Sequence, residues 1–124
     1  MTMKRNKFNA TRVELDGHWF DSKREAARYA ELILMQKAGL ISGLVVHPRY
    51  VLRAFEEKIC EIVPDFSYIE NGRWIVEDVK GGATEMLPTF RLKRKLFEAN
   101  YPSAEFRIIG GKAKFPSVRR IPKV

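Results

Sequence analysis

The dipeptide Asn71-Gly72 constrains the fold of this chain more than any other feature, because it separates two runs of strand-forming residues. Asn-Gly is the strongest short-range signal for a two-residue hairpin turn. Lys58–Ile69, interrupted by Pro64, precedes it and Arg73–Lys80 follows it, and both runs are rich in the β-branched and aromatic residues typical of strands. The sequence therefore predicts two antiparallel strands at the centre of the domain. Residues at equal distances from the turn face each other in such a pair.

Charged residues gather at the open end of this hairpin. Asp65 and Asp78 lie at about the same distance from the turn, so the register brings them opposite each other. Residues two apart on a strand share a face, so Asp78 and Lys80 emerge together. Two carboxylates form a hard-oxygen site suited to Mg²⁺ or Mn²⁺, and a neighbouring lysine can orient water or stabilise charge on a phosphate. The spacing predicts metal-dependent phosphodiester hydrolysis, and a bulge in the strand would exchange Glu77 for Asp78 as the ligand.

Helices and further strands are predicted on both sides of the hairpin. Ser22 and Glu25 have the spacing of a capping box, and the helix that follows runs over 23–38 and stops at Gly39. Its predicted polar side carries Arg24, Arg28 and Glu31, and its predicted apolar side carries Ala26, Tyr29, Ala30 and Ile33. The other predicted elements are a short hairpin at 13–20, a strand over Leu44–Phe55, a helix over Leu87–Asn100 and a strand over Ala104–Ile109. The fold class is α/β (α+β), with a mixed central sheet flanked by helices in the order α-β-β-β-α-β.

The net charge of +8 lies in the two ends of the chain. Residues 1–12 carry four basic side chains and no acidic one, and residues 111–124 carry five basic side chains and no acidic one. This pattern predicts a basic N-terminal arm (1–12), a single domain (13–110) of nearly neutral charge, and a basic C-terminal tail (111–124). Basic ends of this kind favour a polyanion partner such as nucleic acid. The alternative is that they only aid solubility.

The composition argues against several classes of protein. No run approaches the ~20 apolar residues of a membrane span, and the N-terminus lacks the apolar run of a signal peptide. A single cysteine, Cys60, leaves no internal disulfide and no multi-cysteine zinc site, and it fits a cytoplasmic protein. No Walker loop or Ser-His-Asp set supports ATP use or acyl transfer.

These motifs resemble those of the PD-(D/E)XK nuclease superfamily, which has a restriction-endonuclease-like fold. Pro64-Asp65 matches the PD of that pattern, and Asp78-Val79-Lys80 matches the (D/E)XK. The order of predicted elements over 22–109 matches as well. More closely, the chain is similar to a small phage-borne family of nuclease-like proteins. The matching runs are Asp16-Gly-His-Trp-Phe-Asp-Ser-Lys-Arg-Glu25, Tyr29-Ala-Glu-Leu32, Asp65-Phe66, Asp78-Val-Lys-Gly81 and Lys93-Arg-Lys-Leu-Phe97.

The resemblance implies a Mg²⁺- or Mn²⁺-dependent DNA endonuclease in the cytoplasm, that of a bacterial host if the protein is phage-encoded. Asp65, Asp78 and Glu25 would be catalytic residues and metal ligands, joined by the backbone carbonyl of Val79, and Lys80 would position the attacking water. Glu25 has the alternative role of closing the capping box, and the two roles can coexist. A nuclease without a separate recognition domain would read DNA shape, so branched DNA such as a junction or flap is one expected substrate. Resolvases of that kind act as homodimers.

Other residues are candidates for contacting nucleic acid. The helix over 87–100 has a basic side, and the C-terminal tail is basic throughout. His47 precedes a proline and could be structural, act as a general base or contact phosphate. Two rival functions remain, a non-catalytic nucleic-acid-binding module and a small basic RNA-associated protein. The candidate nucleic-acid contacts are Lys93, Arg91, Arg94, His47, Lys112, Lys114, Arg119 and Arg120.

Overall fold

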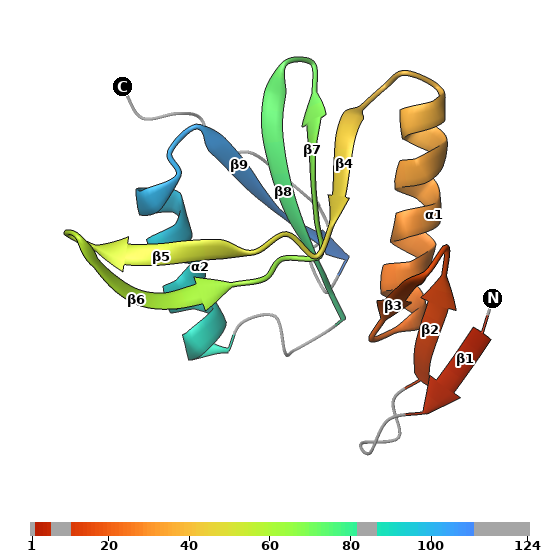
Figure 1. The fold of residues 1–124 in the computed structure, drawn as a ribbon, viewed down its shortest axis with the longest axis horizontal. Coiled ribbons are helices and arrows are strands. Elements are labelled where there is room, and N and C mark those ends of the chain that lie inside the picture. Colours follow the sequence, from red (N-terminus) through yellow and green to blue (C-terminus); the bar gives the residue numbers. More distant parts are fainter. Residues whose placement is uncertain (1, 6–10, 82–86, 111–124) are drawn as a thin grey trace.

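The computed structural model describes residues 2–5, 11–81 and 87–110, which form an α+β fold (Figure 1). This fold class agrees with the one predicted from the sequence. The described residues contain two helices and nine strands, and the strands are arranged in three sheets. In chain order the elements are β1 (Thr2–Arg5), β2 (Thr11–Leu15), β3 (His18–Phe20), α1 (Lys23–Lys37), β4 (Ser42–Val46), β5 (Tyr50–Ala54), β6 (Glu57–Ile62), β7 (Phe66–Glu70), β8 (Arg73–Lys80), α2 (Pro88–Asn100) and β9 (Ala104–Gly110).

The central sheet has the strand order β4-β7-β8-β9. β4, β7 and β8 are antiparallel neighbours, whereas β9 runs parallel to β8 after the crossover through α2. Asn71 and Gly72 both have positive φ, as a tight hairpin turn requires, and they join β7 to β8 as predicted. The pairing of Phe66 with Glu77 sets the register. One step further along, Asp65 stands opposite Asp78, which confirms the predicted juxtaposition.

Two of the predicted strands are wrong, because each is two strands. Leu44–Phe55 breaks at His47 and Pro48 into β4 and β5, and Lys58–Ile69 breaks before Asp65 into β6 and β7. His47 has φ 53°, which turns the chain out of the sheet, and the prolines at both breaks cannot donate to a strand ladder. β5 and β6 therefore pair with each other as a separate hairpin that leaves the central sheet (Figure 1). The predicted order holds for the remaining elements α1, β4, β7, β8, α2 and β9.

The central sheet separates two apolar cores. The first includes Phe20, Tyr29 and Phe66 and joins the sheet to α1 and to the β1–β3 sheet. The second includes Leu52 and Phe97 and joins the other face to α2 and the β5–β6 hairpin. In Figure 1, α1 and α2 accordingly lie on opposite sides of the central strands. Each core holds large aromatic side chains, which bury the most apolar surface per residue.

Successive side chains of β8 point to opposite faces of the central sheet, so its charged residues divide between the two sides. Ile75 belongs to the α1 core and Val76 to the α2 core. By the same period of two, Glu77 faces α1, whereas Asp78 and Lys80 face the side of α2. A regular strand therefore carries Asp78 to the open end of the hairpin, and no bulge exchanges it with Glu77.

Helix α1 begins and ends as predicted. The Ser22 hydroxyl accepts a hydrogen bond from the backbone N–H of Glu25 at 3.1 Å, and Gly39 follows the last turn with φ 79°. The predicted division of its faces is wrong at two positions. Leu32 is buried where Ala30 was expected, and the side chain of Arg28 is only 17% exposed because it reaches Glu77 in the sheet.

The two basic ends differ in what the structure describes. Part of the predicted N-terminal arm is strand β1, which pairs antiparallel with β2 from Thr2↔Glu14 to Arg5↔Thr11. The C-terminal tail at 111–124 lies outside the described residues. Neither helix in the described part of the chain is long and apolar enough to cross a membrane.

Candidate metal centre

Three segments that are distant in the sequence meet where β8 ends. The first turn of α1 is held there by Arg24, whose guanidinium donates to the Lys80 carbonyl at 3.2 Å. The start of β7 is held by the Asp65 N–H, which donates to the Glu77 carbonyl at 3.1 Å. The end of β4 is held by the His47 N–H, which donates to the Asp65 carbonyl at 2.8 Å. These three hydrogen bonds fix the positions of the side chains described next.

Asp65 and Asp78 are in direct contact, and both are buried. The Asp65 N–H donates to Asp78 Oδ1 at 3.2 Å, and the Val79 N–H donates to Asp65 Oδ2 at 2.7 Å. The N–H and C=O of one strand residue point to the same neighbouring strand. The Val79 carbonyl, a predicted ligand, therefore lies on the same side of β8 as Asp65.

Lys80 is held beside Asp78. Its Nζ lies 3.1 Å from Asp78 Oδ2 and 4.2 Å from the centroid of the Phe90 ring of α2. The ion pair and the cation–π contact together restrict a side chain that is otherwise flexible. The ammonium group thus stays next to the carboxylates, as the shared strand face predicted.

Glu25 lies at the start of α1 and also among the side chains that could hold a metal ion. Its N–H is bonded to the Ser22 cap, and its carboxylate accepts a hydrogen bond from the Asp21 N–H at 3.2 Å. The same carboxylate lies with His47 and Asp65, and one ligand atom from each of the three falls within 4.8 Å of the others. We call Glu25, Asp65 and Asp78 the carboxylate cluster.

His47 is the residue whose place in this site the sequence did not predict. It was expected to contact nucleic acid or act as a base, but its imidazole lies with two carboxylates as a possible metal ligand. The ring also packs against Phe20, with 5.7 Å between centroids. The available signal was the His47-Pro48 pair inside an apparent strand, since a proline there marks a bend.

The carboxylates of the cluster repel one another when they are ionised. Burial raises the pKa of Asp65, and the neighbouring Asp78 carboxylate raises it further. Burial also raises the pKa of Glu25 from 4.5 to about 6; the hydrogen bond from the Asp21 N–H opposes this increase, and the charge of Asp78 adds to it. Burial lowers the pKa of His47, so its imidazole is neutral and can act as a ligand at pH 7. A bound cation would offset the repulsion among these carboxylates.

Glu77, the alternative ligand, is fully occupied elsewhere. Its side chain is 0% exposed and receives two hydrogen bonds from Arg28, at 2.7 and 3.0 Å. The Tyr68 hydroxyl donates a third, at 2.5 Å. Burial and the adjacent Glu77 raise the pKa of Tyr68 above its usual value, so the phenol keeps its proton. Glu77 is a structural residue on the α1 side of the sheet.

The predicted nucleic-acid contacts on α2 divide into two groups. Arg94 is engaged within the fold, since it donates to the Phe106 carbonyl at 3.4 Å and pairs with Glu98 at 3.5 Å. Arg91 is exposed and Lys93 is half-buried. The other predicted contacts lie outside the described residues, namely Lys112, Lys114, Arg119 and Arg120.

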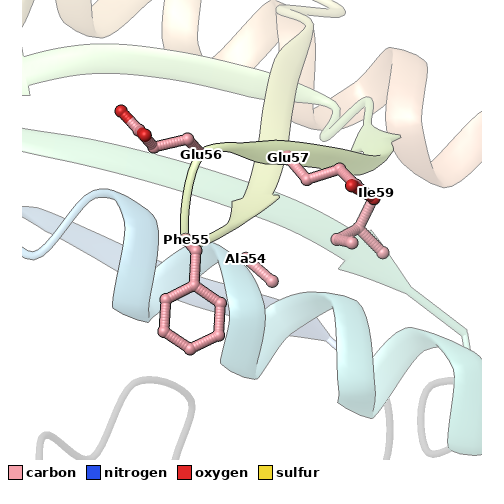
Figure 2. A pocket seen from close by; sticks show the side chains of 5 residues that line it. All are labelled: Ala54, Phe55, Glu56, Glu57 and Ile59. Carbon is pink, nitrogen blue, oxygen red and sulfur yellow. The ribbon is translucent and has the colours of Figure 1, made fainter.

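A hollow at the tip of the β5–β6 hairpin is a separate surface feature. Figure 2 shows its five lining side chains, among them the exposed ring of Phe55. They offer two carboxylates and no basic group, so this hollow is a poor place for a phosphate. The lining residues are Ala54, Phe55, Glu56, Glu57 and Ile59.

The donor set at the end of β8 fits a divalent cation. Glu25, His47 and Asp65 could supply two carboxylate oxygens and an imidazole nitrogen, and the buried Asp78 carboxylate lies beside Asp65. The chemistry that such a cation supplies is the activation of water and the stabilisation of a phosphate's charge. The Lys80 ammonium group lies beside the same carboxylates.

Replacing Asp65 by Asn is expected to stabilise the cation-free protein at pH 8 by a few degrees in melting temperature. Asn keeps the oxygen that accepts from the Val79 N–H but removes the charge that burial and Asp78 disfavour. The pKa of Asp65 is raised above 3.8 in the folded protein, so Asp65 loses its proton more readily in the unfolded chain. The stability of the fold therefore decreases as the pH rises above that value. The gain should therefore vanish near pH 4.

Thermal denaturation with a chelator at the two pH values checks this expectation. Glu57→Gln at the exposed hairpin tip is the matched control and should show no pH-dependent gain. If Asp65→Asn melts no higher than the wild type at pH 8, burial and Asp78 do not disfavour the ionised Asp65 carboxylate in the folded protein.

A family model described as "Protein of unknown function (DUF1064)" matches residues 5–116. The match covers the whole carboxylate cluster, His47 and Lys80. No curated protein and no solved structure matches the chain.

Proposed function

The chain belongs to the DUF1064 family, and from the geometry of its carboxylate cluster we propose that it is a metal-dependent endonuclease that hydrolyses phosphodiester bonds in DNA. One observation carries the proposal. Glu25, His47 and Asp65 group their ligand atoms within 4.8 Å, directly beside the Asp78–Lys80 ion pair. A cation site next to a fixed ammonium group is the arrangement that phosphoryl chemistry needs.

Each residue has a distinct role in this proposal. Glu25, Asp65 and Asp78 hold the cation, with the Val79 carbonyl as a further ligand. When bound, the cation supplies Lewis-acid chemistry at the scissile phosphate and lowers the pKa of water. Lys80 orients the attacking water and offsets charge on the phosphate. The ion pair to Asp78 and the Phe90 ring hold the Lys80 ammonium in place for that task.

The distribution of charge supports nucleic acid as the substrate. The basic excess of +8 lies in the chain ends, and basic ends of this kind favour a polyanion partner. The described elements form one small α+β fold, and we propose that it recognises DNA shape more than base sequence. We extend the proposal to branched DNA as one substrate class, with a second copy of the chain to cut the opposite strand.

The main rival is a DNA-binding module that keeps the fold without catalysis. Binding alone would favour the removal of acidic groups from a surface that meets phosphates. Here burial raises the pKa of Asp65, so the cluster is costly to keep in a protein that binds no cation. Costly ionisable groups of this kind concentrate at functional sites.

Incubating the full chain with Mg²⁺ or Mn²⁺ and a panel of nucleic acids tests the proposal. The panel contains linear, nicked, flapped and four-way DNA and a matched RNA. We expect cleavage of DNA that depends on the cation and leaves products with 5′-phosphate ends. Binding to DNA without cleavage under every cation would favour the non-catalytic module, and binding to RNA alone would favour the RNA-associated protein.

Replacing Lys80 by Ala is expected to lower the cleavage rate by about 10²-fold and to change cation affinity much less. Lys80 acts on the water and the phosphate, whereas the carboxylates hold the cation. Single-turnover cleavage and calorimetric cation binding separate the two effects. An equal loss of both would make Lys80 a structural partner of Asp78 instead.

A further inference from the structure

We infer that His47 is a nitrogen ligand of the cation and that the site prefers a first-row transition cation such as Mn²⁺ over Mg²⁺. The inference rests on the proposed function for the role of the site, and it adds the chemical class of the cation. It is carried by the position of the imidazole, which shares one ligand cluster with Glu25 and Asp65.

The three side chains come from three separate segments. Glu25 lies in the first turn of α1, His47 follows β4, and Asp65 precedes β7. A cation bound at about 2.1 Å from each ligand atom allows at most about 4.2 Å between any two of them. Ligand atoms within 4.8 Å of one another can therefore reach a shared cation by short side-chain movements. The flexible Glu25 side chain can supply that movement.

The backbone conformation at His47 holds its imidazole beside Glu25 and Asp65. His47 has φ 53°, an uncommon conformation for a residue other than glycine, and the buried Pro48 follows it. Its N–H is bonded to the carbonyl of Asp65, which ties the two candidate ligands to each other. The Phe20 ring packs beside the imidazole, and so restricts its rotation. An exposed histidine without a role would need none of these restraints.

A mixed set of donors changes the preference among cations. Mg²⁺ takes oxygen ligands almost exclusively, whereas imidazole nitrogen suits transition cations. Mn²⁺ accepts the two carboxylates as readily as Mg²⁺ does and follows the transition series in its affinity for nitrogen. With His47 as a ligand, the affinity for Mn²⁺ should exceed that for Mg²⁺ by about tenfold or more.

Pulsed electron paramagnetic resonance of Mn²⁺ bound to the full chain tests the nitrogen ligand directly. We expect a coupling to ¹⁴N in the wild type and its loss in His47→Asn. Asn tolerates a positive φ better than most residues, so this variant keeps the backbone turn. Calorimetry with Mn²⁺ or Mg²⁺ alone gives the second readout. His47→Asn should lower Mn²⁺ affinity by about tenfold or more and Mg²⁺ affinity by much less.

The other histidine of the chain provides the control. His18→Ala should keep both the ¹⁴N coupling and the Mn²⁺ preference. A wild-type protein that binds Mn²⁺ without a ¹⁴N coupling overturns the inference, as does one that binds no Mn²⁺. DNA cleavage with Mg²⁺ would then leave the proposed function standing. A coupling lost in His47→Asn, in a protein that cuts no DNA, would support the nitrogen ligand and overturn the nuclease.

Discussion

Asp78→Asn is expected to lower DNA cleavage by about 10³-fold or more while leaving DNA binding intact or tighter. The substitution removes a cation ligand and the partner of Lys80, whose Nζ lies 3.1 Å from Asp78 Oδ2. It also removes a negative charge from beside the phosphate, which favours binding. Asn retains an oxygen that can accept from the Asp65 N–H, so the fold is preserved. Single-turnover cleavage and equilibrium DNA binding measure the two effects.

Glu56→Gln is the matched control for this variant. It removes one negative charge at the tip of the β5–β6 hairpin, on a side chain that lines the separate hollow of Figure 2. Its cleavage rate should equal that of the wild type. If Asp78→Asn cuts DNA at the wild-type rate, Asp78 is not part of the catalytic site.

Arg28→Ala is expected to lower the free energy of unfolding by about 3–5 kcal/mol. Glu77 is fully buried, and the substitution removes two of its three hydrogen bonds. The remaining carboxylate would be a buried charge with only the Tyr68 hydroxyl as partner, which is the costly half of a broken ion pair. A loss of this size is a large share of the stability of a domain of this length. Urea denaturation at pH 7 measures it.

A second variant tests whether burial is the cause of this loss. Arg49→Ala is the comparison, because Arg49 pairs with Glu61 while 66% exposed, and exposed pairs contribute about 1 kcal/mol or less. Equal losses for Arg28→Ala and Arg49→Ala would show that the buried pair is not a main support of the fold.

Capping and turn residues correctly predicted the elements whose ends they determine. The Ser22 cap and Gly39 gave the bounds of α1, and the Asn71-Gly72 turn gave the register that brings Asp65 opposite Asp78. The two long strands were wrong because strand-forming residues continue through Leu44–Phe55 without showing which partner they pair with. Partner choice depends on distant segments, and only the proline at each break indicated a change.

The site was predictable where its residues share one hairpin. Asp65, Asp78 and Lys80 follow from strand period and turn position alone. His47 and Arg28 do not, because each is brought to its partner by a tertiary contact. His47 reaches Asp65 through a positive-φ turn, and Arg28, expected on a solvated helix face, reaches across to Glu77. Neither contact can be predicted from the spacing of residues along the sequence.

The dependence of DNA cleavage on cation concentration tests the central claim most directly. The cation concentration that half-saturates single-turnover cleavage should equal the dissociation constant measured by calorimetry on the same protein. Both values should increase together in Asp65→Asn, whose side chain lies in the carboxylate cluster. Cleavage that persists in a chelator, or that keeps its half-saturating concentration when Asp65→Asn no longer binds the cation, would contradict a metal-dependent nuclease site at the end of β8.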